Sequence, residues 1–137
     1  MTLFKRNLPV IFFISFFLNL IWENLHAGLY FGISQGLNFM PFFILPAIVD
    51  AGIIILLYWA VMAGGFELSA KKIMLILSYG MIVAIFIELA GLSLHLWNYA
   101  PAMPQIFGLG LSPLLQMAVL PLLSIFVSAK LLKKRVF

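Results

Sequence analysis

Four long apolar segments, separated by short polar connectors, make up most of the chain. They run from about residue 8 to 30, 42 to 63, 73 to 97 and 112 to 131. Each is long enough for a helix that crosses a bilayer core of ~30 Å, which takes about 20 apolar residues. The segments lack the strict apolar–polar alternation of barrel strands. The pattern predicts an all-α membrane protein, a four-transmembrane-helix bundle that forms a single domain over residues 1–137.

Composition agrees with a bilayer as the solvent. Hydrophobic residues make up 65% of the chain and charged residues 9%, against about half and a quarter in soluble domains. Cysteine is absent, which excludes disulfides and thiolate metal sites. The sequence also contains no P-loop, dinucleotide-binding, nucleophile-elbow or metalloprotease motif.

The basic residues predict an orientation. They lie before the first apolar segment, between the second and third, and after the fourth, as Lys5, Arg6, Lys71, Lys72, Lys130, Lys133, Lys134 and Arg135. These three regions share one side of a four-helix bundle, and cytoplasmic loops are enriched in Lys and Arg. We therefore expect a multi-pass protein of the bacterial cytoplasmic (inner) membrane with both termini in the cytoplasm. Because the positive charge marks topology, no nucleic-acid partner is expected.

Three of the four acids lie inside predicted helices. At ~1.5 Å per residue, Glu23 and Glu88 lie roughly 22 Å from the cytoplasmic ends of their helices, and Asp50 roughly 12 Å from the outer end of its helix. All three therefore fall in the outer half of the core, and Gln116 lies only about 6 Å from the outer end of the fourth helix. Acids within a membrane are costly and usually functional.

Helical spacing places these residues on inward stripes. Asn19, Glu23, His26 and Tyr30 share one face of the first helix, and Ala84, Glu88, Gly91 and His95 one face of the third. The small residues Ala84 and Gly91 would allow a close helix contact. We predict an outward-facing cavity with Glu23, Asp50 and Glu88 as catalytic candidates. The ligand-binding candidates are Asn19, His26, His95, Gln116, Trp97 and Tyr30.

Several interpretations of the acids remain open. No Lys or Arg is available in the membrane to pair with these acids, so they are protonated, share charge with His26 and His95, or bind a cation. A purely structural set of interhelical hydrogen bonds is the simplest alternative. Glu23 and His26 form an E-x-x-H unit, which di-iron bundles use twice. Since the second unit is missing, we predict no metal, with Glu23, His26, Glu88 and His95 as the alternative ligand set.

The last third of the chain carries a resemblance. Its pattern, E-x6-H-x-W-x-Y-x3-MP-x3-GLGLSPLLQ, runs from Glu88 to Gln116. The carriers are Glu88, Trp97, Tyr99, Met103, Pro104, Gly108, Gly110, Pro113 and Gln116. The pattern resembles a family of small bacterial four-helix integral membrane proteins, and this resemblance implies the architecture but no activity. In layout alone the chain is similar to the sterol-isomerase and sigma-2 group, whose cavities carry paired acids.

Three functions fit these observations. The first is a site that binds a lipophilic, isoprenoid- or lipid-like molecule or transforms it by acid–base chemistry. The second is a proton-coupled small transporter, although a single orientation disfavours the antiparallel homodimers of small exporters. The third is an accessory or assembly subunit of a membrane complex. The expected partners are the lipid bilayer and the lipophilic molecule, and a parallel homo-oligomer or a larger membrane complex is compatible with the sequence.

Overall fold

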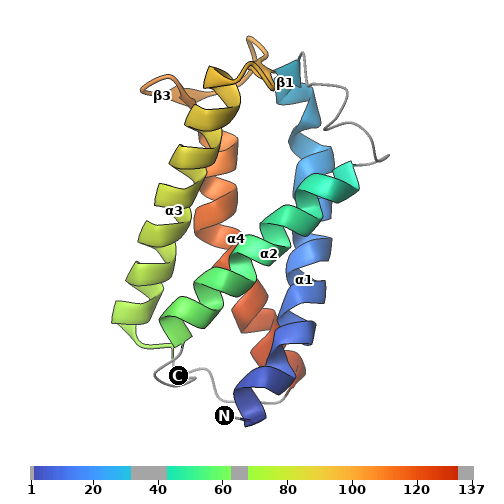
Figure 1. Cartoon of the computed structure of the whole chain (residues 1–137), viewed down its shortest axis with the longest axis vertical. Coiled ribbons are helices and arrows are strands. Elements are labelled where there is room, and N and C mark those ends of the chain that lie inside the picture. The colour runs from blue at the N-terminus through green and yellow to red at the C-terminus, as the bar shows by residue number, and fades with distance from the viewer. Residues whose placement is uncertain (1, 32–42, 63–67, 133–137) are drawn as a thin grey trace.

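The computed structural model describes residues 2–31, 43–62 and 68–132. Within these ranges four long helices form a bundle (Figure 1), namely α1 (Thr2–His26), α2 (Ile44–Met62), α3 (Ala70–Ser93) and α4 (Leu111–Leu131). All four are long and apolar enough to cross a membrane. The predicted four-helix, all-α architecture is therefore confirmed.

Short extended segments, which the sequence pattern did not predict, connect the helices at one end. A 3-10 turn (Ala27–Leu29) leads from α1 into β1 (Tyr30–Phe31), which pairs antiparallel with β2 (Asn98–Tyr99). A further hydrogen bond joins the Ala100 N–H to the Leu29 carbonyl oxygen at 2.8 Å. We call the paired strands β1 and β2 the strap, because they tie the end of α1 to the segment that follows α3.

A small hairpin follows the strap. It consists of β3 (Gln105–Ile106) and β4 (Leu109–Gly110). Its two-residue turn, Phe107 and Gly108, has φ angles of 52° and 79°. Positive φ at both central positions is typical of the tight turns that match the twist of a hairpin.

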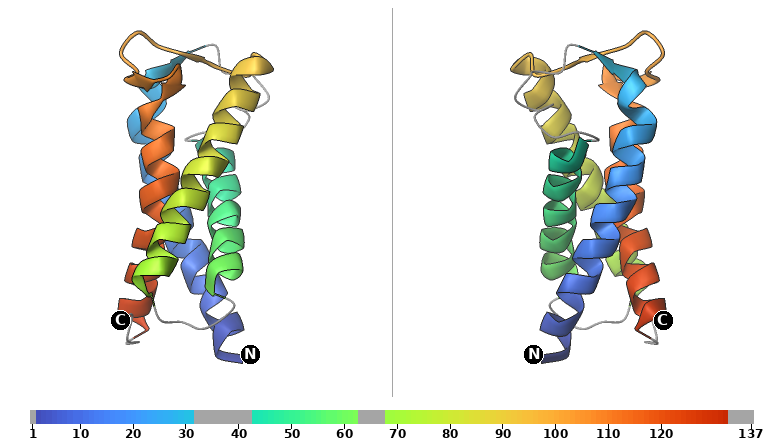
Figure 2. Two further views of the ribbon diagram at one scale, coloured as in Figure 1. Left: turned by 90° about the vertical axis from the view of Figure 1, so that its left-hand side faces the viewer. Right: turned by 90° about the vertical axis from the view of Figure 1, so that its right-hand side faces the viewer.

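The two ends of the bundle differ. In Figure 1 the start of α1 and the end of α4 lie at one end of the bundle, and the strap lies at the opposite end. The two side views in Figure 2 show the same arrangement, with the helices running between these ends. The start of α3, which contains Lys71 and Lys72, and the end of α4, which contains Lys130, lie near the chain termini. The described basic residues are therefore gathered at the end opposite the strap.

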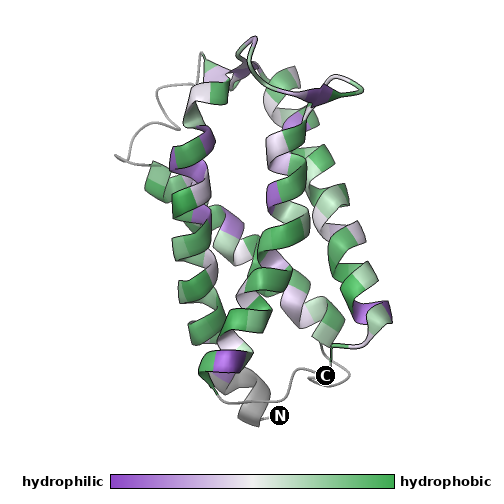
Figure 3. Cartoon of the chain, turned by 180° about the vertical axis from the view of Figure 1, so that it is seen from behind, coloured by the Kyte–Doolittle hydropathy of each residue, from purple (hydrophilic) through white to green (hydrophobic). Residues whose placement is uncertain are grey.

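Helix α1 shows how the bundle distributes polarity. Its buried residues include Asn7, Ile11, Ser15 and Asn19, which repeat every four positions and form one face. The opposite face exposes large apolar side chains, at Phe13, Phe17, Ile21 and Leu25. Hydrophobic residues cover most of the helices in Figure 3. Polar residues inside and apolar residues outside suit a lipid solvent, because apolar side chains that face lipid carry no free-energy cost of exposure.

The apolar core occupies the half of the bundle that is nearer the termini. Its largest buried side chains include Ile11 from α1, Ile54 and Tyr58 from α2, Ile76 from α3 and Ile125 from α4. A smaller cluster of Ala84, Leu114 and Met117 joins α3 to α4 closer to the strap. The remaining space in the strap half of the bundle holds the polar residues described below.

Helices α3 and α4 pack closely at Gly80. A Cβ atom at this position would lie 2.0 Å from the backbone oxygen of Met117, so only glycine fits. The predicted close contact at Ala84 is also present, because Ala84 is buried against Leu114 and Met117. The prediction that another helix packs against Gly91 was wrong. The indole of Trp97, and not a helix, occupies the space beside Gly91, where a Cβ atom would lie 1.9 Å from the ring.

Helix α3 ends at Ser93 and not near residue 97. The Leu96 N–H donates to the Gly91 carbonyl at 2.9 Å, and the His95 N–H donates to the Leu92 carbonyl at 3.1 Å. These two bonds form a Schellman motif, in which the residue after the cap takes a left-handed conformation. That residue is His95, with φ of 56°. The chain therefore turns back at His95, and the side chain leaves the stripe on which the sequence placed it.

Candidate functional site

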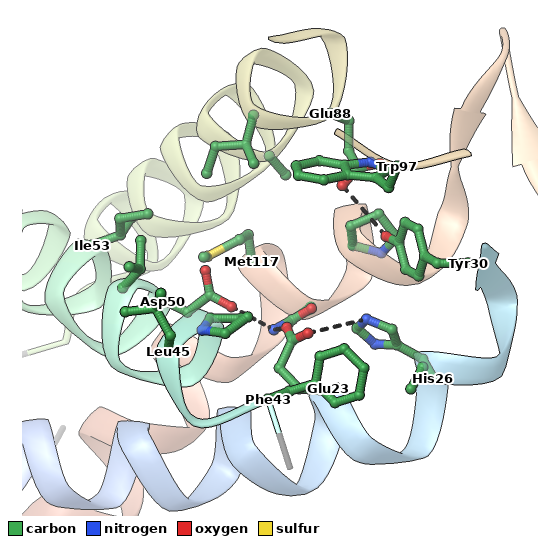
Figure 4. Close-up of a pocket in the computed structure, with 17 residues that line it drawn as sticks. Glu23, His26, Tyr30, Phe43, Leu45, Asp50, Ile53, Glu88, Trp97 and Met117 are labelled. Atoms are coloured by element: carbon green, nitrogen blue, oxygen red, sulfur yellow. Dashed lines mark hydrogen bonds and ion pairs between the residues drawn. The ribbon is translucent and has the colours of Figure 1, made fainter. Parts of the chain in front are cut away.

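A cavity of about 390 Å³ lies between the four helices in the strap half of the bundle. This volume falls in the range of small-molecule pockets, ~300–1,000 Å³. Every helix contributes to its wall, and so does the segment after α3. The lining residues are Glu23, His26, Ala27, Tyr30, Phe43, Leu45, Pro46, Val49, Asp50, Ile53, Ala84, Ile87, Glu88, Trp97, Pro113, Gln116 and Met117. Most of the wall is apolar, and three carboxyl groups reach into it (Figure 4).

Gln116 of α4 joins two helices through its side-chain amide. Its Nε2 lies 2.7 Å from Glu23 Oε1, 2.9 Å from Asn19 Oδ1 and 2.8 Å from Asp50 Oδ2. An amide nitrogen carries two hydrogens, so it can donate fully to two of these three oxygens. The third oxygen needs a hydrogen or a cation from elsewhere. We call Asn19, Glu23, Asp50 and Gln116 the carboxyl cluster.

His26 extends the carboxyl cluster along α1. Its Nε2 lies 3.5 Å from Glu23 Oε2, one helical turn away. Its Nδ1 is buried and has no hydrogen-bond partner among the described residues. His26 itself is only 8% exposed, and it lines the cavity. The ring therefore presents one nitrogen beside Glu23 and one nitrogen without a hydrogen-bond partner.

Glu88 of α3 belongs to a separate group of hydrogen bonds beneath the strap. One oxygen accepts a hydrogen bond from the Tyr99 hydroxyl, and the other lies 3.4 Å from the Tyr30 hydroxyl, a long hydrogen bond. Tyr30 and Tyr99 are opposite each other in the strap. Glu88 thus joins the two strands of the strap to α3, while Glu23 and Asp50 face Gln116.

Both strap tyrosines lie just outside the helical spans, and their surroundings shift their acidity. Burial raises the pKa of Tyr30 above its usual value, and the nearby Glu88 carboxyl adds to the shift. Burial likewise raises the pKa of Tyr99, and its hydrogen bond to Glu88 adds to the shift. The hydroxyls therefore keep their protons and act as donors to Glu88.

Aromatic rings surround the cavity near the strap. Tyr30 packs edge-on against Trp97, with 6.3 Å between ring centroids, and lies 5.4 Å from the His26 ring. The indole N–H of Trp97 is buried and lies beside Glu88 (Figure 4). The position of Trp97 depends on Gly91, which leaves room for the indole.

Most of the predicted site residues come together. Glu23, Asp50, Glu88, His26, Tyr30, Trp97 and Gln116 line the cavity. Asn19 is fully buried behind the cavity wall, and its Oδ1 accepts a hydrogen bond from the lining residue Gln116. His95 does not join them, since it is exposed on the turn after α3. The alternative metal set of Glu23, His26, Glu88 and His95 is therefore not assembled, and the described residues contain no other group of three or more acids or histidines arranged for a metal.

Sequence reasoning missed two kinds of contributors. Tyr99 fits an interfacial aromatic belt by its position, yet its hydroxyl binds Glu88. The only cue in the sequence was the spacing, since Tyr99 follows Glu88 by 11 residues. This cue could not be used, because Tyr99 lies beyond a helix end that the pattern did not reveal. Phe43, Leu45, Val49 and Ile53 of the apolar wall gave no cue, because they look like any other apolar residues in a membrane segment.

Comparisons with known proteins bring no further information about the site. No protein-family model, no curated protein and no solved structure matches the chain. The resemblance to the bacterial four-helix family therefore stays a prediction. The function is argued below from the geometry alone.

Proposed function

We propose that this protein binds a lipophilic, isoprenoid- or lipid-like molecule in the cavity and can act on it by acid–base chemistry. The observation that carries the proposal is the cavity of about 390 Å³, which has an apolar wall and contains Glu23, Asp50 and Glu88. A passive bundle would bring such acids together only for interhelical hydrogen bonds, and it would not need space between them. An apolar pocket with a few convergent polar groups is the usual form of a ligand site.

The acid–base part of the proposal rests on the carboxyl cluster. Glu23 and Asp50 share the amide of Gln116, and His26 lies beside Glu23. Carboxyl groups in such different surroundings can divide the roles of proton donor and proton acceptor. A protonated carboxyl group in a dry cavity can protonate an alkene or a carbonyl group, and a carboxylate nearby can remove a proton.

The proposal includes a membrane setting with both termini in the cytoplasm. Three observations support it: four helices of spanning length, apolar outward faces, and basic residues gathered near the chain ends. The chain has no native cysteine, so single cysteines can be labelled cleanly. With a membrane-impermeant maleimide on intact cells, Ala102→Cys should react and Leu132→Cys should react only after lysis. The opposite labelling would reverse the orientation.

The binding test uses the full chain, purified in mild detergent, with native mass spectrometry and analysis of the extracted lipophilic molecules. The wild-type protein should carry a bound apolar molecule. Val49→Trp should reduce its amount, because Val49 lines the cavity and is half exposed, so a larger side chain can fill the space. Leu56→Trp, at an exposed position lower on the same helix, is the matched control. An equal amount of ligand in the wild type and in Val49→Trp would contradict the proposal.

One observation favours the proton-coupled transporter as a second candidate. Buried polar residues continue from the carboxyl cluster toward the termini, at Ser15, Ser124, Ser128 and Asn7. Such a column gives protons a more polar route than the surrounding core. Proton flux in vesicles that is lost in Glu23→Gln and reduced in Ser15→Ala would favour the transporter. A proton flux equal to that of empty vesicles would contradict the transporter function.

A further inference from the structure

The polar end of the cavity has too few hydrogen-bond donors. The two hydrogens of the Gln116 amide face oxygens of Asn19, Glu23 and Asp50, all within 2.9 Å. One of these three oxygens is therefore left without a hydrogen from Gln116. Because a buried acceptor without a donor is unfavourable, this end of the cavity is completed either by a proton on one of the carboxyl groups or by a ligand that brings hydrogens, and a cationic ligand can replace that proton.

His26 adds another acceptor to the same end. A carboxylate beside Nε2 favours the tautomer of the neutral ring that carries its hydrogen on Nε2, which here lies 3.5 Å from Glu23 Oε2. Nδ1 then has a lone pair and no hydrogen. This nitrogen is buried and unpartnered among the described residues, on a side chain that is more than nine-tenths buried and lines the cavity. Glu23, Asp50 and His26 Nδ1 together offer three acceptor groups.

The charge of the lining points in the same direction. Glu23, Asp50 and Glu88 line the cavity, and none of the described lining residues is Lys or Arg. Glu88 already accepts from Tyr30 and Tyr99, and the buried indole N–H of Trp97 lies beside Glu88 and away from the carboxyl cluster. The deficit of donors and of positive charge is therefore concentrated at Glu23 and Asp50. An anionic head group, such as a phosphate or a carboxylate, would meet repulsion there, and the donors of Gln116 and His26 already face the carboxyl groups.

Building on the proposed function, we infer that the ligand is a lipophilic primary amine. Its ammonium group has three N–H donors, equal in number to the acceptor groups of Glu23, Asp50 and His26. Its hydrocarbon chain lies along the apolar wall formed by Leu45, Val49 and Ile53 of α2.

The test compares three probes with the same twelve-carbon chain: dodecylamine, 1-dodecanol and dodecyl phosphate. Each is added to the full-length protein in neutral nanodiscs, and binding is measured by native mass spectrometry. The amine should bind at least about tenfold more tightly than the alcohol, as hydrogen bonds to charged groups are stronger than neutral ones. The phosphate should bind more weakly than both.

Variants separate recognition of the head group from general binding of the chain. Glu23→Gln and Asp50→Asn should each weaken binding of the amine by about tenfold and leave binding of the alcohol nearly unchanged. Glu67→Gln is the charge-matched control, because the sequence places this fourth acid in the loop between the second and third helices. It should bind the amine like the wild type.

The outcomes distinguish the two proposals. Equal binding of amine and alcohol, or tighter binding of the phosphate, would overturn the inference and leave the lipophilic cavity of the proposed function intact. Loss of amine binding in Glu67→Gln to the same extent as in Glu23→Gln would also overturn it, since the removal of any acidic charge would then explain the preference. Failure of all three probes to bind would overturn both proposals.

Discussion

Gln116 Nε2 on α4 lies 2.7 Å from Glu23 Oε1 on α1, although 93 positions separate the two residues in the chain. The same nitrogen lies 2.8 Å from Asp50 on α2. One neutral amide thus links α1, α2 and α4 at the level of the bundle where Glu23 and Asp50 lie. Because Gln116 stands between the acids, it is the residue on which the arrangement of the carboxyl cluster depends most directly.

Replacing Gln116 by leucine should destabilise the bundle. The change keeps the approximate size of the side chain but removes the donors for Asn19, Glu23 and Asp50. Buried acceptors left unpaired cost about 1–3 kcal/mol. We expect a loss of this size in the free energy of unfolding, measured by denaturant titration in detergent. Gln105→Leu is the matched control, because Gln105 is exposed on β3 and should change stability by less than about 0.5 kcal/mol. Equal effects of the two substitutions would show that the amide contacts do not stabilise the fold.

The close approach of α3 and α4 gives a second prediction. Gly80→Ala places a Cβ atom 2.0 Å from the Met117 backbone oxygen, so the helices must separate. Overpacking of this kind costs about 1–3 kcal/mol. Gly52→Ala on α2 meets no atom within 4 Å and should be neutral or stabilising by up to about 1 kcal/mol. Thermal unfolding of the two variants in the same detergent measures the difference, and a stable Gly80→Ala variant would argue against this helix contact.

The strap tyrosines predict a pH dependence at the alkaline end. Burial and Glu88 raise the pKa values of Tyr30 and Tyr99 above the usual value of about 10. Below pH ~10 both hydroxyls are protonated in the folded and unfolded states, so their contribution to stability is fully present. Above that pH the unfolded chain releases these protons and the folded chain keeps them, so stability should fall as the pH rises.

Tyrosinate absorbance measures this effect directly. In the folded protein, wild type and the double variant Tyr30→Phe/Tyr99→Phe should give the same titration curve up to about pH 11, because neither hydroxyl ionises there. After unfolding, the wild type should show two additional tyrosines that titrate near pH 10. A difference between the folded curves near pH 10 would mean that these hydroxyls are accessible and are not held by Glu88.

The sequence predicted the helices well because all four are long, mostly apolar segments. A helix in a bilayer, the proposed setting, must satisfy its own backbone, so length and hydropathy were enough to find α1 to α4. Helical spacing was also enough to place Glu23 and His26 on one face.

The error at His95 came from the end of α3. A Schellman motif is usually closed by glycine, and here a histidine takes the left-handed position. A pattern of apolar residues that continues through Leu96 and Trp97 contains no sign of that turn.

The contacts of the strap depend on packing that no local pattern encodes. The pairing of Tyr30 with Tyr99 joins residues from opposite halves of the chain through two-residue strands. Such short strands have no periodicity to detect. The apolar wall was equally hidden, since Val49 and an ordinary lipid-facing valine are the same in sequence. These features required the structure, and they decide which acids face the ligand and which hold the strap.

The division of roles among the acids gives the last prediction. Glu88 accepts hydrogen bonds from Tyr30 and Tyr99, so it should hold the strap closed. Glu88→Ala removes both acceptors. The Ala100 N–H, which donates to the Leu29 carbonyl at 2.8 Å across the strap, should then exchange with solvent about tenfold faster. Hydrogen–deuterium exchange of peptides that cover residues 96–102 measures this opening.

Asp50→Asn serves as the control for the strap, because Asp50 contacts Gln116 and neither tyrosine. It should leave exchange at Ala100 unchanged and alter ligand binding instead. Glu88→Gln should give an intermediate rate, since one of its two side-chain atoms can still accept a hydrogen bond. If Asp50→Asn opened the strap as much as Glu88→Ala, the three acids would act as one cooperative unit. If Glu88→Ala left exchange unchanged, strand pairing alone would hold the strap, and Glu88 would be free to act on the ligand together with Glu23 and Asp50.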